Sequence, residues 1–317
     1  MRAWLPVVAA LFAVACDRPV PQPHPRPPRE AGAADSNDFH PADYRLVYAE
    51  EFEGSALDRG QWCTRYIYEG GPPVQTRDPE CTPDGKGTLD FLNDEAQRYR
   101  DVDASGRPLH EVQAGVLTLI ATKAPGAKHY ESAMVRSKRL FKPSAGTSLY
   151  ITARVLLPSI RGTWPAFWLN SDRDAHGKLA WPPEIDIFEA PVNDREDRIE
   201  MLKVGAATRG RPRNMFFMHV DFSAKWRTYH AQKSLRDRWV ETAVEWSNDR
   251  VCYFLEGIKL MCEEYRWIHN DGREAPPAHI LLNLAIGGQW AGRHGIDDAR
   301  FPARFSIDYV RVYERGR

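Results

Sequence analysis

The sequence predicts an all-β fold in which two sheets pack face to face. From Tyr44 onward, short segments of alternating apolar and polar residues are separated by Gly, Pro, Asn and Asp, and few segments keep a helical period over about ten residues. About a dozen such strands fall within roughly 270 residues, which is more than one open sheet usually holds. We therefore expect a two-sheet β-sandwich or jelly roll.

The chain is long enough for a substantial core and carries no net charge. Its 317 residues suit one large domain or two small ones, and its 43 basic residues balance 43 acidic ones. This balance gives no electrostatic reason to expect a nucleic-acid partner. A neutral substrate fits the composition, and we expect a monomer.

The first sixteen residues have the features of an export signal. An early Arg precedes an apolar run from Ala3 to Ala15, which is shorter than the roughly 20 residues of a transmembrane helix. The run ends at Cys16 and resembles the lipobox of bacterial lipoproteins, although Ala13 replaces the usual Leu. We expect a lipoprotein-type signal peptide over residues 1–16 and a membrane anchor at Cys16. An ordinary signal peptide, which would give an extracellular protein, is the alternative.

Residues 17–40 predict a spacer between this signal and the folded domain. Six prolines lie between Pro19 and Pro28, a density that favours an extended polyproline conformation. A proline-rich ligand for a partner domain is the alternative. Residues 41–317 are then expected to form the folded domain.

Two segments show the strand pattern most clearly. In SLYITARVLLP, residues 148–158, one face carries Leu149, Ile151, Ala153 and Val155, and the other carries Tyr150, Thr152 and Arg154. FSIDYVRVYE, residues 305–314, alternates in the same way.

Apart from Cys16, four cysteines remain, which in an exported chain favours two disulfides. Cys252 and Cys262 flank a turn at Glu256 and Gly257, so a hairpin would place them opposite each other. Cys63 and Cys81 then pair by elimination. Free buried thiols are the alternative.

The segment EIDIFE, residues 184–189, breaks the alternation of an extended strand. Glu184 and Asp186 should share a face with Phe188, which leaves Glu189 on the opposite face. A β-bulge at Phe188 would shift the alternation by one residue and return Glu189 to the face of the other acids. Acids are poor strand formers, so three of them here indicate a function. A solvated strand with a buried Phe is the alternative.

Three acids on one strand face predict the chemistry of glycoside hydrolysis. Neighbouring acids on that face lie about 6 to 7 Å apart along the strand. On a concave sheet the outer two can converge to roughly 5 to 5.5 Å, the separation found in retaining hydrolases. One carboxylate attacks the anomeric carbon and the other protonates the leaving oxygen. Mutual repulsion raises the pKa of at least one acid, so one proton is retained near neutral pH.

Several segments resemble, in order, glycoside hydrolase family 16 and its bulged branch of laminarinases, agarases and carrageenases. They are YAEEFEGSALDRGQW, NDEAQRY, GVLTLIATK, GTWPAFWLNSD, EIDIFE, VEWSNDRVCYFLEG, ILLNLAIGGQWAG and IDYVRVY, spanning about residues 44–314. The resemblance implies a concanavalin-like jelly roll with a concave substrate cleft. It also makes Glu184 the nucleophile, Glu189 the acid/base and Asp186 the residue that tunes the nucleophile.

Candidate sugar-binding residues lie in the same segments. A pyranose packs its C–H face on a flat ring, and strand ends carry binding residues, which points to Trp164, Trp181 and Trp290. Trp168 is expected to pack in the core instead. The side chains of Asn93 and Gln289 could reach sugar hydroxyls.

The resemblance implies two further features. A histidine usually lines the cleft of this family, and His219 is the expected one, with His230 as the alternative. Family members often bind a structural Ca²⁺, which Glu51 and Asp308 would ligate here, but the chemistry requires no cofactor. The Arg-rich region 195–238 departs most from the family pattern. It is expected to be a solvated basic loop, and a contact surface for an acidic polysaccharide is the alternative.

These observations predict an exported, endo-acting, retaining hydrolase of a β-linked polysaccharide, with a laminarin-type β-1,3-glucan as the expected substrate. Agarose-like or carrageenan-like galactans are the second choice. A transglycosylase and a non-catalytic polysaccharide-binding module are further alternatives. Such modules lack the paired glutamates that this chain has.

Overall fold

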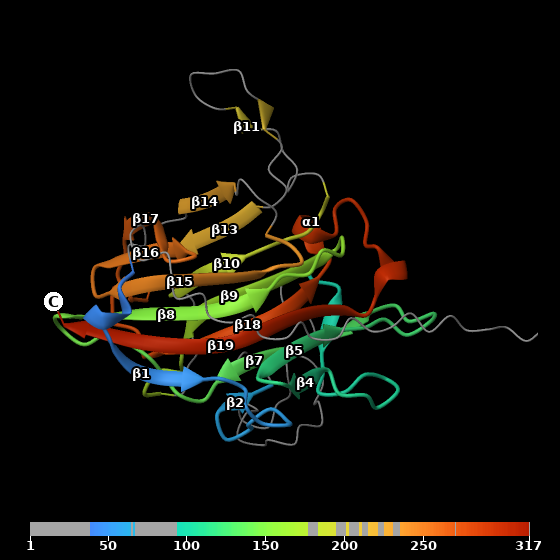
Figure 1. Cartoon of the computed structure of the whole chain (residues 1–317), viewed down its shortest axis with the longest axis horizontal. Coiled ribbons are helices and arrows are strands. Elements are labelled where there is room, and N and C mark those ends of the chain that lie inside the picture. The colour runs from blue at the N-terminus through green and yellow to red at the C-terminus, as the bar shows by residue number, and fades with distance from the viewer. Residues whose placement is uncertain are drawn as a thin grey trace, which may run out of the picture.

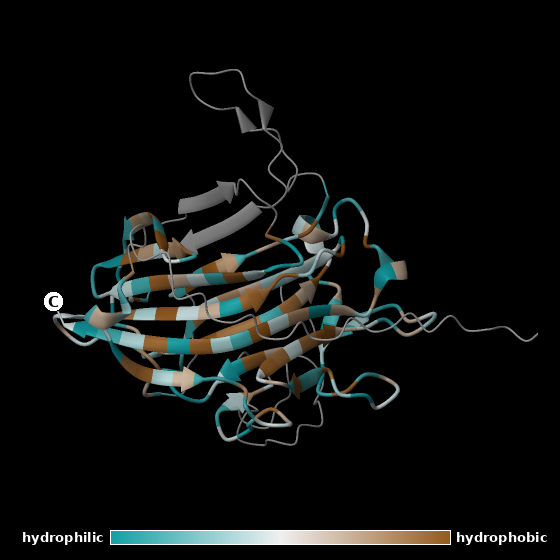
Figure 2. Cartoon of the chain, in the orientation of Figure 1, coloured by the Kyte–Doolittle hydropathy of each residue, from teal (hydrophilic) through white to brown (hydrophobic). Residues whose placement is uncertain are grey.

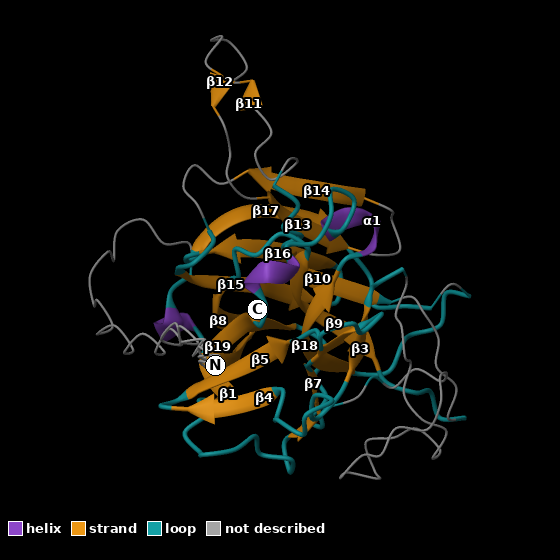
Figure 3. Ribbon diagram, turned by 90° about the vertical axis from the view of Figure 1, so that its right-hand side faces the viewer, coloured by secondary structure: helices purple, strands orange, loops and turns teal. Residues whose placement is uncertain are grey.

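The protein is a sandwich of two large antiparallel sheets (Figures 1 and 3). This computed structural model describes residues 39–64, 66, 94–176, 183–194, 201–202, 209–210, 215–220, 225–230, 235–269 and 271–316. The predicted all-β class is confirmed. Within these ranges, no helix has the length and apolar character needed to cross a membrane.

The eight-stranded sheet has the order β17-β16-β15-β8-β19-β5-β4, and β1 also pairs with β19. Its strands are β1 (Arg45–Glu50), β4 (His110–Gln113), β5 (Val116–Ala121), β8 (Thr147–Leu156), β15 (Trp239–Ser247), β16 (Arg250–Leu255), β17 (Ile258–Glu264) and β19 (Ala303–Gly316).

The seven-stranded sheet has the order β14-β13-β10-β9-β18-β7-β2. Its strands are β2 (Trp62–Cys63), β7 (Met134–Ser137), β9 (Thr163–Ser171), β10 (Glu184–Glu189), β13 (Met215–Val220), β14 (Lys225–His230) and β18 (Ala278–Ile286). Two small sheets pair β3 (Gln97–Tyr99) with β6 (Tyr130–Ser132) and β11 (Met201–Leu202) with β12 (Arg209–Gly210). The helical elements within the described ranges are α1 (Gly288–Ala291) and the 3₁₀ turns Pro41–Asp43 and Asp298–Arg300.

The core lies between the two sheets and follows from the alternation of each strand (Figure 2). On β8, Leu149, Ile151, Ala153 and Val155 all enter this core, as predicted. Tyr150 points to the opposite, outer face of the eight-stranded sheet, where Phe39 stacks on its ring at 3.7 Å between centroids. The described chain therefore starts with an aromatic contact on the face that the seven-stranded sheet does not cover.

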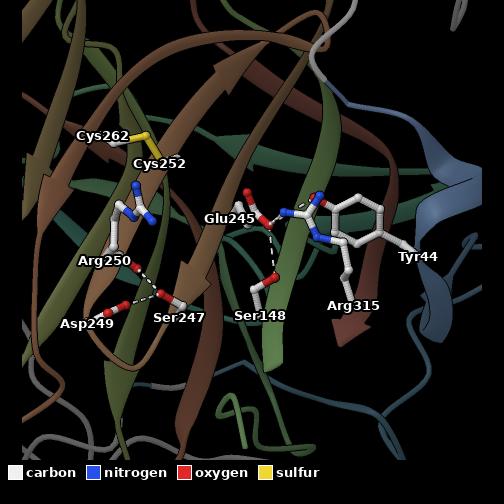
Figure 4. Close-up of a disulfide and its surroundings, with 9 residues drawn as sticks. All are labelled: Tyr44, Ser148, Glu245, Ser247, Asp249, Arg250, Cys252, Cys262 and Arg315. Atoms are coloured by element: carbon white, nitrogen blue, oxygen red, sulfur yellow. Dashed lines mark hydrogen bonds and ion pairs between the residues drawn. A yellow bond between two sulfur atoms is a disulfide. The ribbon is translucent and has the colours of Figure 1, made fainter. Parts of the chain in front are cut away.

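The predicted hairpin disulfide is present. Cys252 and Cys262 are paired opposite each other on β16 and β17 and are bonded (Figure 4). The turn between them places Glu256 and Gly257 at positive φ, 52° and 76°, as a tight hairpin turn requires. Cys63 is also disulfide-bonded, and its predicted partner, Cys81, lies outside the described residues.

Candidate active site

The strand β10 contains the predicted bulge. Against β9, Asp186 is opposite Trp168 and Phe188 is opposite Phe167, so two steps along β10 correspond to one step along β9. The register against β13 slips over the same stretch, between Asp186 and Glu189. The alternation therefore shifts by one residue between the second and third acids.

The structure corrects the position of the extra residue. Ile187, not Phe188, has no opposite residue on β9. Both Ile187 and Phe188 face inward, and the Phe188 ring is fully buried in edge contacts with Phe167 and Phe305. The two adjacent apolar residues thus share the core side, which anchors the bulge through burial.

The acids occupy the outer side of the seven-stranded sheet, because Ile185, Ile187 and Phe188 fill the inner side. We call the outer surface around Glu184, Asp186 and Glu189 the acidic face. Across the sheet, Glu184 is opposite Asn170, and Glu189 is opposite Ala166, which in turn is opposite Asn283 of β18. Asp186 is buried, whereas Glu184 and Glu189 remain partly exposed.

The surroundings of Glu189 favour its protonated form. Burial raises the pKa of Glu189 well above its usual range, and the charges of Asp186 and Glu95 raise it further. The indole N–H of Trp164 lowers this pKa in part, although it does not complete a hydrogen bond of good geometry. Glu189 is therefore suited to donate a proton near neutral pH.

The sequence interpretation missed a hydrogen-bonded chain that ends at Glu95, whose charge acts on Glu189. Trp168 Nε1 donates to Asn283 Oδ1 at 2.8 Å, Asn283 Nδ2 donates to the Tyr99 hydroxyl at 3.0 Å, and that hydroxyl donates to Glu95 at 3.4 Å. Glu95, Gln97 and Tyr99 alternate within NDEAQRY, so strand periodicity was a signal that they share a face. Asn93, the sugar ligand predicted from this segment, lies outside the described residues.

Trp168 packs in a hydrophobic core, as expected, but this core is separate from the one between the two sheets. Trp168 is buried, but on the outer side of the seven-stranded sheet, in a cluster of Tyr66, Tyr99, Met134, Ala166, Trp168 and Leu281. Its alternation with Phe167 and Leu169, which face the core, places it there. The side of the sheet that carries the acids therefore has its own aromatic layer.

Trp164 and Trp290 lie together beyond Glu189. Their rings stack at 5.0 Å between centroids, and Trp164 is mostly buried. Gln289, beside Trp290 on α1, lines a pocket of about 590 Å³ with Asp94 and Arg293. The backbone N–H of Gln289 donates to Asp94 at 2.8 Å, which holds α1 against the segment before β3.

The remaining predicted ligands are only partly described. Trp181 and Cys16 lie outside the described residues. The backbone of His219 is opposite Asp186 on the neighbouring strand β13, and His230 is on β14 opposite Met215. The register therefore places His219, rather than His230, next to an acid of the acidic face.

The predicted calcium ligands do not fit a calcium ion. Glu51 accepts two hydrogen bonds from Arg311, at 2.6 and 2.9 Å, and Asp308 pairs with Arg154 at 2.9 Å. A guanidinium already supplies positive charge to each carboxylate, whereas calcium needs six to eight oxygen ligands. No group of three or more His, Cys, Asp or Glu side chains suited to a metal occurs in the part of the chain that the structure describes.

Comparisons with known proteins identify relatives over most of the chain. A β-glucanase of Rhodothermus marinus is 30% identical over 264 residues, which covers 80% of this chain and 84% of that protein. The laminarinase of Flavobacterium sp. UMI-01 has 25% identity and a TM-score of 0.61, and covers 85% of this chain and 100% of its own. SCLam, an endo-β-1,3(4)-glucanase from family GH16, has the same fold at 24% identity and a TM-score of 0.60, covering 89% and 96%. No protein-family profile matches the chain.

Proposed function

The chain belongs to glycoside hydrolase family 16, and we propose that it is a retaining endo-β-1,3-glucanase that uses Glu184 and Glu189. One observation carries the assignment of residues. The bulge at Ile187 brings Glu184, Asp186 and Glu189 onto one side of β10 while the apolar residues between them enter the core. The β-glucanase relative supports the substrate class.

In the first step, the Glu184 carboxylate attacks the anomeric carbon of the bound sugar. A bond forms between this carbon and a Glu184 oxygen, and the glycosidic C–O bond breaks. Glu189 transfers its proton to the leaving oxygen, so the departing sugar leaves as a neutral alcohol. The raised pKa of Glu189 keeps that proton available.

In the second step, the same two residues release the sugar with retained configuration. The Glu189 carboxylate now takes a proton from water, whose oxygen attacks the anomeric carbon and displaces Glu184. Asp186 lies between the two glutamates on the same side of β10, where its charge raises the pKa of Glu189. Its position fits the tuning role that the family resemblance implies.

The substrate binds along the acidic face in this proposal. The stacked Trp164 and Trp290 offer an aromatic surface near Glu189, and the pocket beside Gln289 is large enough for a sugar unit. Trp181, Asn93 and His219 are further proposed ligands.

Release of reducing ends from a substrate panel tests this function. Wild type should act on laminarin in preference to mixed-linkage glucan, agarose or carrageenan. Glu184→Gln and Glu189→Gln should each lower kcat by at least about 1000-fold. Unchanged activity in both variants would refute the assignment, and binding of laminarin without turnover by wild type would identify a binding module.

The matched control distinguishes the two glutamates. Azide should restore activity on an activated aryl glycoside in a Glu189→Ala variant and give a β-azide product, because the covalent intermediate still forms. In a Glu184→Ala variant the azide product should have the opposite, α configuration. The reverse pattern would exchange the two roles.

We further propose export and lipid attachment at Cys16, with residues 17–40 as the tether. The described chain starts at Phe39 on the outer side of the eight-stranded sheet, opposite the acidic face, which suits a tether that leaves the site accessible. Labelled fatty acid should enter wild type and be absent from Cys16→Ser. Labelling that persists in the variant would refute the anchor.

A further inference from the structure

We propose that Glu95 is a positioning residue that keeps the proton of the general acid on Glu189 at neutral pH. This proposal rests on the proposed acid/base role of Glu189. Glu95 does not attack or protonate the sugar; its effect is exerted through its negative charge beside Glu189.

Strand register and hydrogen bonds connect Glu95 to the row of residues that contains Glu189, and the charge of Glu95 acts on Glu189. Glu189, Ala166 and Asn283 form one row across β10, β9 and β18 on the acidic face. Ala166 carries only a methyl group, and Tyr99 packs in the same cluster as Ala166 while accepting a hydrogen bond from Asn283. Tyr99 in turn donates to Glu95, so the segment 95–99 is joined to Asn283 of this row.

The donors around Glu95 favour its ionised form. Its carboxylate accepts hydrogen bonds from Gln97 Nε2 and from the Tyr99 hydroxyl. Burial and the charge of Glu95 hold the pKa of Tyr99 well above its usual range, so its hydroxyl remains a donor. A carboxylate with two donors is stabilised as an anion even though Glu95 is only 7% exposed.

Contacts at the end of β18 fix the positions of the Gln97 side chain and of the Glu95 backbone. Gln97 Oε1 accepts the backbone N–H of Ile286 at 2.7 Å, and the backbone of Glu95 bridges to Gly287 at the end of β18. Glu95 is therefore attached to the same strand that carries Asn283. Its anionic form is stabilised before substrate binds.

The groups that act on Glu189 are two acids and one uncharged donor, whereas Glu95 accepts hydrogen bonds from two donors. Two acids act on Glu189: Asp186 on its own strand and Glu95 in the segment before β3. The neighbouring group from β9 is the uncharged indole of Trp164. From β13, His219 lies at the register position beside Asp186, and Phe217 lies opposite Glu189. When two nearby carboxyl groups compete for one proton, the group with fewer donors holds it.

The test is the pH dependence of kcat/KM on laminarin for Glu95→Gln. The variant keeps the shape of the side chain and removes its charge, so the basic limb should move to lower pH. We expect about a 3- to 10-fold loss of kcat/KM near pH 7.5 and little loss near pH 5. Glu95→Asp retains the charge, so the basic limb of its pH profile should lie between those of Glu95→Gln and wild type.

Two controls separate this effect from a general disturbance. Glu131→Gln removes a carboxylate from β6, the strand that pairs with β3, and should leave the limb in place. For an aryl glycoside whose leaving group needs no proton, the formation of the glycosyl-enzyme should be equally fast in wild type and Glu95→Gln. Circular dichroism and thermal unfolding report whether each variant is folded.

An unmoved basic limb in a folded Glu95→Gln variant would overturn the proposal. An equal loss of activity at every pH, or a rise in KM alone, would also overturn it, because either result indicates a structural or sugar-binding role. The proposed function fails separately, if Glu189→Gln retains activity.

Discussion

Acids on the two outer faces of the sandwich have opposite electrostatic surroundings. On the eight-stranded sheet, Glu245 accepts hydrogen bonds from Tyr44 at 3.0 Å and Ser148 at 2.9 Å and pairs with Arg315 (Figure 4). On the same sheet, Glu51 and Asp308 pair with arginines as well. On the seven-stranded sheet, the described charges that act on Glu189 are two other acids.

This difference in neighbouring charges distinguishes acids that stabilise the fold from an acid that is suited to transfer a proton. A carboxylate with a guanidinium partner stays ionised and holds strands together. A carboxyl group beside other acids in a half-buried site retains its proton more strongly, which costs stability but supplies a general acid. The same residue type thus has two roles, and its neighbours decide which.

Moving Glu189 off the acidic face should have the largest effect on this comparison. Insertion of one alanine between Phe188 and Glu189 adds one step of alternation after the bulge, so Glu189 would turn toward the core and leave the acidic face. We expect at least a 1000-fold loss of laminarin hydrolysis and a loss of several kcal/mol in the free energy of unfolding. Activity assays and urea unfolding measure both.

Ile187→Val is the matched control for that insertion. It keeps the bulge and the register of Glu189, and should cost about 0.5 to 1.5 kcal/mol with nearly normal activity. A folded insertion variant that cleaves laminarin at the wild-type rate would contradict the need for Glu189 on the acidic face.

The aromatic residue behind the bulge should have the next largest effect. Phe188→Ala removes a fully buried ring from contacts with Phe167 and Phe305, so the free energy of unfolding should fall by about 3 to 5 kcal/mol. Phe188→Leu should cost much less, because it keeps most of the apolar volume. Urea unfolding of both variants tests this order, and equal losses would contradict it.

The sequence predicts those parts of the fold that depend on neighbouring residues. The Cys252–Cys262 disulfide follows from a hairpin within a single segment, and the core side of β8 follows from simple alternation. The bulge was predicted one residue too late, because Ile187 and Phe188 are both apolar and only the pairing with β9 shows which has no opposite residue.

Contacts between distant segments explain the errors. Glu95 acts on Glu189 by its charge, and it is linked by Tyr99 to Asn283, which lies 184 positions after Tyr99 in the chain. Arg154 reaches Asp308 across a sequence separation of 154, so the sequence did not indicate that an arginine, rather than calcium, would meet this acid. Each acid was recognisable, but its partner depended on strand order.

An ion pair on the eight-stranded sheet should affect stability alone. Glu51→Gln removes the charge that pairs with Arg311 in a partly exposed site, so the free energy of unfolding should fall by about 1 kcal/mol. The pH profile of kcat/KM should not change. The melting temperature of wild type should be the same with and without a chelator, because Glu51 and Asp308 are paired with arginines. A chelator-induced loss of stability would show that this face does bind calcium.

The smallest expected effect is a gain in stability at the acidic face. The unfolded Glu189 carboxyl ionises near pH 4.5, and the folded pKa is well above that value. Between these two values the folded state holds a proton that the unfolded chain has released, so the free energy of unfolding falls as pH rises through this window. Glu189→Gln has no charge to desolvate and should be more stable than wild type by about 0.5 kcal/mol near pH 7.

The same gain should vanish near pH 4, where wild-type Glu189 is protonated in both states. Glu131→Gln, the matched control on β6, should show no such gain at either pH. Thermal unfolding of the three proteins at both pH values measures the difference. A Glu189→Gln variant that is less stable than wild type at pH 7 would contradict the destabilising environment of this acid, and a gain of equal size at both pH values would assign the effect to packing instead of charge.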